Sequence, residues 1–246
     1  MNALDNPIWT ALTTKQAQVA HSAALARRFP PEMTLLGALA ANTAMAFDSL
    51  AQLIQRDAVT LYFSTPPQLP AGWNVVRAVE LHQMVKEDGT SGTGAGDVPA
   101  DASSDVRDQA NQGAAEQHQV IELAPADLPE MSEFYAATRP GRMLCSKIQK
   151  LGMFLGIRYE GKLVAMGGLR LHVSGYREIT TVATLPGFEG RGCGTAIMLA
   201  LMARIQARGE RPFLTVRSDN ERAIQLYQRL GFHQRTRFYS RTIRRA

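Results

Sequence analysis

The chain has 246 residues, a formal net charge of +5 and a hydrophobic fraction of 45%. This length allows one large domain or two small ones, and no stretch is long and apolar enough to predict a membrane-spanning helix. The first residues show no basic segment followed by an apolar core, and the two cysteines supply neither a disulfide framework nor a metal cluster. We therefore expect a cytoplasmic, metal-free protein with no membrane partner.

The N-terminal part, residues 1–85, predicts a small α/β region. Apolar residues recur at helical spacing in three segments, and two further segments have the apolar and β-branched composition of strands. The predicted helices are 9–25, 33–39 and 44–54, and the predicted strands are 59–63 and 73–84.

Residues 86–119 differ from both flanks in composition. Ala, Gly, Ser, Asp and Gln dominate this segment, and Val98 and Val106 are its only large aliphatic residues. Such a composition buries too little apolar surface to offset the entropy of ordering, so the segment is predicted to be a flexible linker. It separates residues 1–85 from a second unit, residues 120–246.

The second unit alternates strands and helices. Gly161 and Gly175 mark tight turns between strands, and Gly231 is placed to end a helix. The expected elements are strands at 120–123, 153–159, 163–173, 178–185 and 213–216, helices at 126–138, 196–205 and 220–230, and a final strand near 238–240. This order predicts the α/β (α+β) class, with a mixed, mostly antiparallel central sheet flanked by helices.

A glycine-rich turn lies between the strand at 178–185 and the helix that follows it. Gly190, Gly192 and Gly194 alternate through the turn, which allows successive backbone N–H groups to converge at a helix N-terminus. The turn therefore predicts a pyrophosphate cradle. Thr195 replaces the third glycine of a dinucleotide fingerprint and Cys193 the lysine of a Walker loop, so both of those nucleotide sites are excluded. A glycine-rich turn without a ligand is the alternative.

Two segments together resemble the signature motifs of a known family. Glu189-Gly-Arg-Gly-Cys-Gly194 is followed by Asn220-x-x-Ala223-x-x-x-Tyr227-x-x-x-Gly231-Phe232. This pair resembles the GNAT acyl-CoA-dependent N-acetyltransferases over about half of the chain, and is most similar to the glycine N-acyltransferase-like subgroup. The resemblance implies a GNAT-like fold at the C-terminus, with residues 1–85 as a degenerate acetyltransferase half that shapes the acceptor pocket. Glu189 departs from the family, which usually has Gln or Arg there.

The same resemblance implies acetyl-CoA as the acyl donor and assigns residues to its binding. Backbone groups on the strand at 178–185 would hold the pantetheine arm, the glycine turn would hold the pyrophosphate, and a helix cap would contact the arm. The implied cofactor-binding residues are Val182, Thr184, Glu189, Gly190, Arg191, Gly192, Cys193, Gly194, Thr195 and Asn220.

Three catalytic roles are expected. By resemblance, the Val182 amide stabilises the oxyanion and the Tyr227 phenol protonates the departing thiolate. Glu178 is the candidate general base: it precedes Val182 by four residues, so in a regular strand both side chains point to the same face. A water relay is the alternative base, and packing in the apolar core is the alternative role for Tyr227.

The function expected from these motifs is transfer of an acetyl group from acetyl-CoA to a primary amine by direct attack in a ternary complex. A non-catalytic acyl-CoA-binding module is the alternative, motivated by Glu189. The five arginines between Arg235 and Arg245 suit the outward face of a terminal strand, so we expect no nucleic-acid partner. Neither the acceptor nor the oligomeric state follows from the sequence. Arg139, Arg142 and Arg170 either hold an acidic group of the acceptor or lie on the surface.

Overall fold

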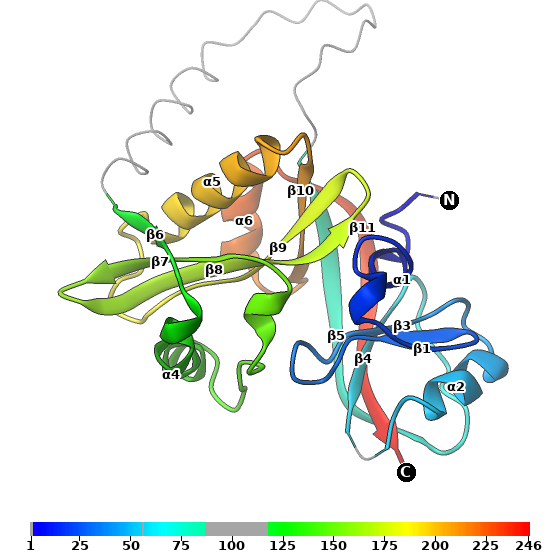
Figure 1. Cartoon of the computed structure of the whole chain (residues 1–246). Helices are drawn as coiled ribbons and strands as arrows, with labels where there is room; N and C mark the ends of the chain where they lie inside the picture. Colours follow the sequence, from blue (N-terminus) through cyan, green and yellow to red (C-terminus); the bar gives the residue numbers. More distant parts are fainter. Residues whose placement is uncertain (1, 56, 87–117) are drawn as a thin grey trace, which may run out of the picture.

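The computed structural model describes residues 2–55, 57–86 and 118–246, and these residues build one large mixed sheet with helices on both faces (Figure 1). The sheet has eight strands in the order β4-β11-β5-β10-β9-β8-β7-β6. The strand bounds are β4 Val59–Phe63, β5 Trp73–Val85, β6 Val120–Glu122, β7 Phe154–Tyr159, β8 Lys162–Val173, β9 Tyr176–Thr184, β10 Arg211–Arg217 and β11 His233–Arg245.

Most neighbouring strands of this sheet run antiparallel. Among the described pairs, β9 and β10 alone run parallel, because helix α5 (Cys193–Gln206) connects them by a crossover. The antiparallel pairs β7–β8 and β8–β9 are hairpins whose turns contain Gly161 (φ +80°) and Gly175 (φ +75°). The predicted mixed, mostly antiparallel sheet and both predicted turns are confirmed.

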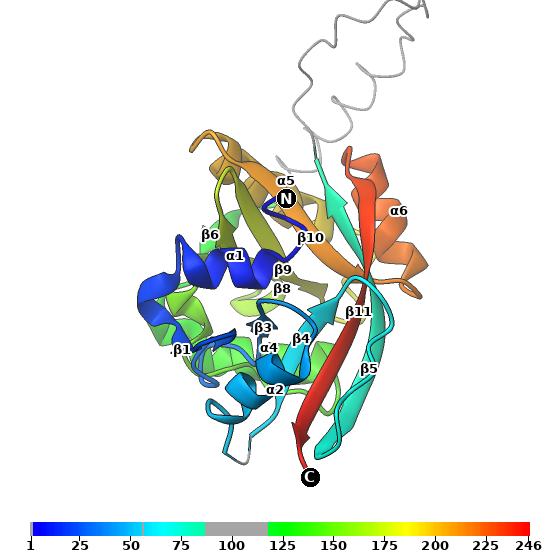
Figure 2. The same ribbon diagram turned by 90° about the vertical axis from the view of Figure 1, so that its right-hand side faces the viewer.

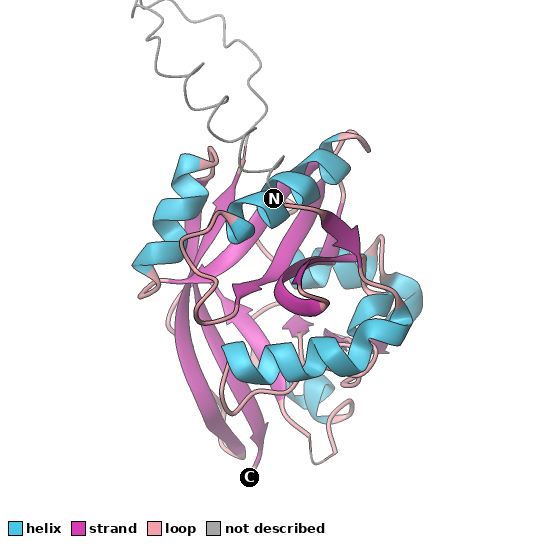
Figure 3. Cartoon of the chain, turned by 90° about the vertical axis from the view of Figure 1, so that its left-hand side faces the viewer, coloured by secondary structure: helices cyan, strands magenta, loops and turns pink. Residues whose placement is uncertain are grey.

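Helices cover the two faces of the sheet differently (Figures 1 and 3). α5 and α6 (Glu221–Arg229) lie on one face, and α4 (Leu128–Thr138) lies on the other. On the α5 face, a Cβ built on Gly167 of β8 would meet the side chains of Ile197 and Leu201 in α5. Among the described residues, no helix combines the length and apolar character needed to cross a bilayer.

The N-terminal residues pack on the face opposite α5. α1 (Pro7–Thr13) buries Ile8 and Leu12 in a cluster with Leu171 of β8 and Phe213 of β10. Phe213 precedes Leu214, which pairs with Ile179 on the α5 face, and alternation turns Phe213 to the other side. Figure 2 shows α1 in front of the strands, with α5 above it. The remaining N-terminal elements are η1 Ala17–Val19, a small sheet of β1 His21–Ala23, β2 Ala26–Arg28 and β3 Gly37–Leu39, and α2 Ala44–Ala51.

Two of the predicted N-terminal helices are wrong. The pattern at 9–25 predicted one helix, but α1 ends at Thr13 and the following residues form η1 and β1; the segment 33–39 contains β3 rather than a helix. Short apolar runs fit a buried strand as well as a buried helix, and here contact with neighbouring strands decides. A Cβ on Gly37 would lie 2.6 Å from Val59 Cγ2, so β3 packs tightly against β4. The helix at 44–54 and the strands at 59–63 and 73–84 are confirmed as α2, β4 and β5.

Strands from the two predicted units share the large sheet. β5 lies between β11 and β10, and its residues pair with both along most of its length. The predicted linker at 86–119 lies, apart from Lys86 and residues 118–119, outside the described residues. The division of the chain into two units at this segment therefore stays a prediction. In space, strands from both predicted units form one sheet.

Candidate acyl-CoA site

The site is organised by an opening between the parallel strands β9 and β10. The two strands pair only from Arg211 to Leu214 and from Tyr176 to Ile179. Beyond that point β9 continues to Thr184 alongside β8, whereas β10 continues to Arg217 alongside β5. Separation of parallel strands at their carboxyl ends is a common ligand-binding position in open sheets. Here it leaves residues 180–184 of β9 without a described strand on that side.

A β-bulge at Thr181 shapes the β9 side of the opening. Thr181 has φ +60°, and the β8–β9 register shifts between the Met166–Ala183 and Gly168–Thr180 pairs. The extra residue interrupts the alternation of side chains along β9. Val182 Cγ2 would lie 3.1 Å from a Cβ on Gly167, so the Val182 side chain faces α5.

The glycine turn lies between the end of β9 and α5, as predicted. Gly187, Gly190 and Gly192 have φ values of +86°, +77° and +82°, a conformation that residues with a Cβ rarely adopt. A Cβ built on Gly190 would meet no described atom within 4 Å, so open space lies beside this backbone. Gly194 is different, because it lies inside the first turn of α5, where a Cβ would meet Leu226 and Thr184 at an ordinary contact distance of 3.8 Å.

The N-terminus of α5 has no side-chain cap. Gly192 is the N-cap residue in a left-handed conformation, and no side chain bonds to the first amides of the helix. Free amides at a helix N-terminus carry partial positive charge and favour an anion. The turn and the helix together therefore provide the chemistry that a pyrophosphate needs, and Gly190 leaves room for the ligand to approach.

The side chains of the turn make contacts of their own. Glu189 forms an ion pair with Arg222 of α6, at 3.0 Å between Oε2 and Nη1, rather than with its neighbour Arg191. The Arg191 guanidinium carbon lies 5.0 Å from the centre of the Phe188 ring. Cys193 is buried, and burial raises the pKa of its thiol, as expected of a spacer rather than a nucleophile.

The residues of the second motif lie in α6 and at its two ends. Asn220 caps α6, accepting a hydrogen bond from the Ala223 amide at 3.2 Å. Tyr227 is half-buried and its ring contacts Phe232 edge-on at 6.1 Å. Burial raises the pKa of Tyr227 above its usual value of 10, although the charge of Arg139 acts in the opposite direction. The phenol is therefore protonated at neutral pH, as a proton donor must be.

Glu178, the candidate general base, lies in a buried ion pair. It is fully buried and accepts two hydrogen bonds from Arg170, both at 2.9 Å. Thr215, which alternates with Leu214 and therefore faces away from α5, donates to Glu178 Oε1 at 3.3 Å. Glu178 and Val182 consequently lie on opposite faces of β9. The expectation of a shared face is wrong, because the bulge at Thr181 shifts the alternation by one residue.

Three arginines were expected either to hold an acidic group of the acceptor or to lie on the surface. Each has a different position in the structure. Arg170 is the buried partner of Glu178, and although burial alone would lower its pKa, the charge of Glu178 raises it. Arg142 is exposed. Arg139, at the end of α4, donates from Nη2 to the Val182 carbonyl at 3.3 Å and lies over the Tyr135 ring. Its Nη1 atom is buried and has no hydrogen-bond partner among the described residues.

Arg139 is thus the site residue that sequence reasoning undervalued. Nothing in the order of residues relates position 139 to Val182, because helix α4 and strand β9 are brought together only by packing across the sheet. Its one sequence signal was its position directly before Pro140 at a helix end. Within the described ranges, no group of three or more histidine, cysteine, aspartate or glutamate side chains is placed to hold a metal ion.

Comparison with known structures shows a close relative over the whole chain. A crystal structure from Novosphingobium aromaticivorans, assigned to the GNAT family of acetyltransferases, superposes with a TM-score of 0.81, is 28% identical and is covered in full, as is this chain. A GCN5-related N-acetyltransferase from Kribbella flavida has a TM-score of 0.58 at 16% identity over 95% of each chain, which shows the shared fold.

Sequence comparison with curated proteins gives shorter matches. N-alpha-acetyltransferase RimI of Mycobacterium tuberculosis is 34% identical over 93 residues, 35% of this chain and 57% of that protein. The mycothiol acetyltransferase of Gordonia bronchialis is 27% identical over 67% of this chain and 54% of that protein. The chain therefore spans little more than half the length of these two relatives. The model of the acetyltransferase (GNAT) family matches residues 118–232, which include the glycine turn, the opening and α6. This part of the chain is similar to the GNAT acetyltransferases.

Proposed function

We propose that this protein is an acyl-CoA-dependent N-acetyltransferase that moves an acetyl group from acetyl-CoA to a primary amine by direct attack in a ternary complex. One observation carries the proposal. The glycine turn, with its three left-handed glycines, ends at the uncapped N-terminus of α5 directly beside the opening between β9 and β10. The uncapped amides of α5 thus lie next to the part of β9 that pairs with no described strand on that side.

In this proposal, different residues contribute to different steps of acyl transfer. The amides of the turn and of the first α5 residues would hold the pyrophosphate, and β9 from Thr180 to Thr184 would hold the pantetheine arm. The Val182 amide would stabilise the oxyanion, an interaction that contributes about 3 kcal/mol in comparable sites. As the amine nitrogen bonds to the acyl carbon and the carbon–sulfur bond breaks, Tyr227 would give its proton to the thiolate. The phenol would then regain a proton from solvent.

Deprotonation of the amine calls for a base, and we assign this role to solvent water rather than to Glu178. Arg170 neutralises the Glu178 carboxylate through two hydrogen bonds, and protonation of Glu178 would leave a buried guanidinium without its counter-charge. In this assignment Glu178 holds Arg170 in place beneath the opening. The amine proton leaves to water on the face opposite α5.

The pairing of Glu189 supports catalysis over the non-catalytic alternative. That alternative arose because a carboxylate beside a pyrophosphate is unfavourable. Arg222 compensates the charge of Glu189 and holds it toward α6. The relatives' names point to different acceptors: RimI is named as an N-alpha-acetyltransferase and the others as mycothiol acetyltransferases. The glycine N-acyltransferase-like subgroup stays our own prediction from the C-terminal placement of the motifs.

Calorimetric titration with acetyl-CoA tests the proposal with a matched pair of variants. Gly190→Glu introduces a charged side chain beside the turn, whereas Gly72→Glu makes the same change at a left-handed glycine before β5. Neither new Cβ meets a described atom within 4 Å, so the backbone strain is comparable. We expect binding by the wild type and by Gly72→Glu, and loss of binding in Gly190→Glu. A wild-type protein that does not bind acetyl-CoA overturns the proposal.

A further inference from the structure

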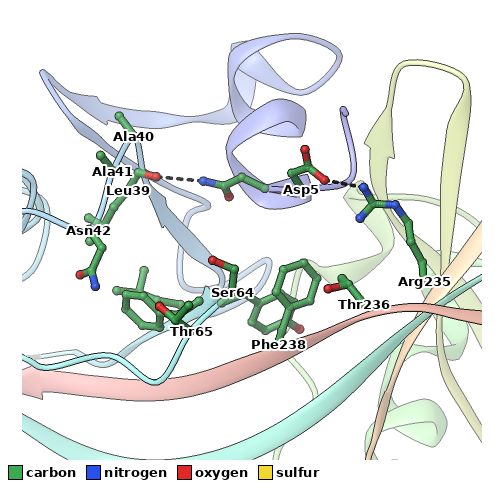
Figure 4. A pocket seen from close by; sticks show the side chains of 14 residues that line it. Asp5, Leu39, Ala40, Ala41, Asn42, Ser64, Thr65, Arg235, Thr236 and Phe238 are labelled. Carbon is green, nitrogen blue, oxygen red and sulfur yellow. Dashed lines mark hydrogen bonds and ion pairs between the residues drawn. The ribbon is translucent and has the colours of Figure 1, made fainter. Parts of the chain in front are cut away.

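A cavity of about 420 Å³ lies on the face of the sheet opposite α5 (Figure 4). Its walls come from the segment before α1, the residues that follow β3, the end of β4 and the start of β11. Ligand pockets in proteins commonly measure about 300–1,000 Å³, so the cavity has room for one small molecule. Most of its wall comes from the N-terminal 65 residues, a part of the chain outside the region that the family model matches.

The wall combines aromatic, hydroxyl and charged groups. Tyr62 and Phe238 stack with their ring centres 5.7 Å apart, and Ser64 and Thr236 bring hydroxyl groups. Asp5 forms an ion pair with Arg235, so the charges at this side of the cavity compensate each other. Such a wall suits a molecule with an apolar body and hydroxyl or amide groups, and it does not select for a polycation or a polyanion.

Two chains of contacts connect this cavity to the opening in the sheet. Arg235 donates to Gln83 Oε1 at 3.0 Å, and Gln83 is the cross-strand partner of Thr215. Thr215 in turn donates to Glu178, which immediately precedes the last β9 residue that pairs with β10.

The second chain runs through Tyr62, which lines the cavity and interacts with Arg170, the ion-pair partner of Glu178. Both chains lie on the face of Phe213 and Thr215, away from α5. The turn, next to α5, and the cavity therefore lie on opposite faces of the sheet, and these contacts connect the cavity wall to the residues beneath the opening.

We propose that this cavity is the acceptor pocket, and that the acceptor is a small-molecule primary amine with an apolar body and hydroxyl or amide substituents. The inference rests on the proposed function, since it names the second substrate of the same reaction. The N-terminal residues then determine acceptor choice, and the turn and β9 determine donor binding.

A pair of tryptophan substitutions tests the pocket. Ala41→Trp places an indole at the exposed mouth of the cavity, and Ala207→Trp makes the same change at an exposed position after α5. The probes are tyramine, glucosamine, spermidine and an alanine-initiated tetrapeptide. Their binding is measured by saturation-transfer NMR, and their acetylation by release of CoA. Titration with acetyl-CoA is run on each variant in parallel.

We expect tyramine or glucosamine to bind the wild type, and kcat/KM for that amine to fall at least tenfold in Ala41→Trp but not in Ala207→Trp. Acetyl-CoA binding is unchanged in both variants. Equal amine binding in wild type and Ala41→Trp overturns the assignment, as does the absence of binding by both tyramine and glucosamine. Acetylation of the tetrapeptide alone also overturns it, in favour of a protein acceptor. Because amine binding is read without acetyl-CoA, failure of donor binding is recognised separately as failure of the proposed function.

Discussion

The substitution Glu178→Gln separates an ion-pair role of Glu178 from a role as general base. The change keeps the size and shape of the side chain and removes its charge. In the wild type the carboxylate is fully buried and accepts hydrogen bonds from Arg170, the Leu171 amide and Thr215. The variant therefore leaves Arg170, whose side chain is 16% exposed, without its counter-charge.

The expected loss in the free energy of unfolding is about 3–5 kcal/mol, the range found when one member of a buried ion pair is removed. Adding Arg170→Met removes the orphaned charge as well. The double variant is expected to lose less stability than Glu178→Gln alone, because no buried charge then lacks a partner. Urea titration of the wild type, both single variants and the double variant measures the cycle.

The activity of Glu178→Gln tests whether Glu178 also has a catalytic role. If Glu178 only positions Arg170, kcat per folded molecule of Glu178→Gln falls by less than about tenfold, whereas loss of a general base costs about 100- to 10,000-fold. The assay measures CoA release across pH 6 to 9, at a temperature where the variant is fully folded. A larger fall in kcat together with a flattened pH profile refutes our reasoning and restores Glu178 as the base. A stability loss below about 1 kcal/mol refutes the ion-pair argument.

Three further substitutions test other parts of the site. Tyr227→Phe is expected to lower kcat at least tenfold with little change in the Kd for acetyl-CoA measured by calorimetry. The raised pKa keeps the phenol protonated throughout the assay range, so we expect no fall in wild-type kcat as the pH rises from 7 to 9, and an alkaline fall in that range contradicts its role. Asn220→Ala removes the cap of α6 and is expected to cost about 1 kcal/mol in urea unfolding, and an unchanged midpoint argues against the cap. Arg139→Ala removes the cation beside the phenol, so a fluorescence or absorbance titration is expected to show an even higher pKa for Tyr227. An unchanged titration shows that the two groups are not coupled.

Local sequence signals predicted the fold where turn-forming residues mark the ends of a helix or strand. Gly161 and Gly175 marked two hairpins, and β4 was predicted with both of its bounds correct. Residues 9–25 contain no glycine or proline. Residues 9–25 are apolar at helical spacing, yet the chain divides into α1, η1 and β1, because contact with β8 and with β2 outweighs propensity.

The candidate site was predictable where backbone geometry follows from glycine. The left-handed positions at Gly190 and Gly192 and the cap at Asn220 lie where the motifs indicated. The position of Glu178 was not predictable, since one inserted residue at Thr181 reverses the face of the strand and no single sequence marks a β-bulge there. The contact of Arg139 with Val182 and the cavity wall were not predictable either, because both depend on segments far apart in the chain.

The strand order of the sheet bears on how the chain acquires its structure during synthesis. β4 and β5 follow each other along the chain, but β11 lies between them and pairs with both. Because β11 runs antiparallel to both, β4 and β5 run parallel to each other, so residues 64–72 lead back along the sheet instead of forming a hairpin turn. The native arrangement requires the last strand of the chain to enter between these two earlier strands. A chain that ends before His233 would expose two unpaired strand edges, which makes such products prone to aggregation and dependent on chaperones.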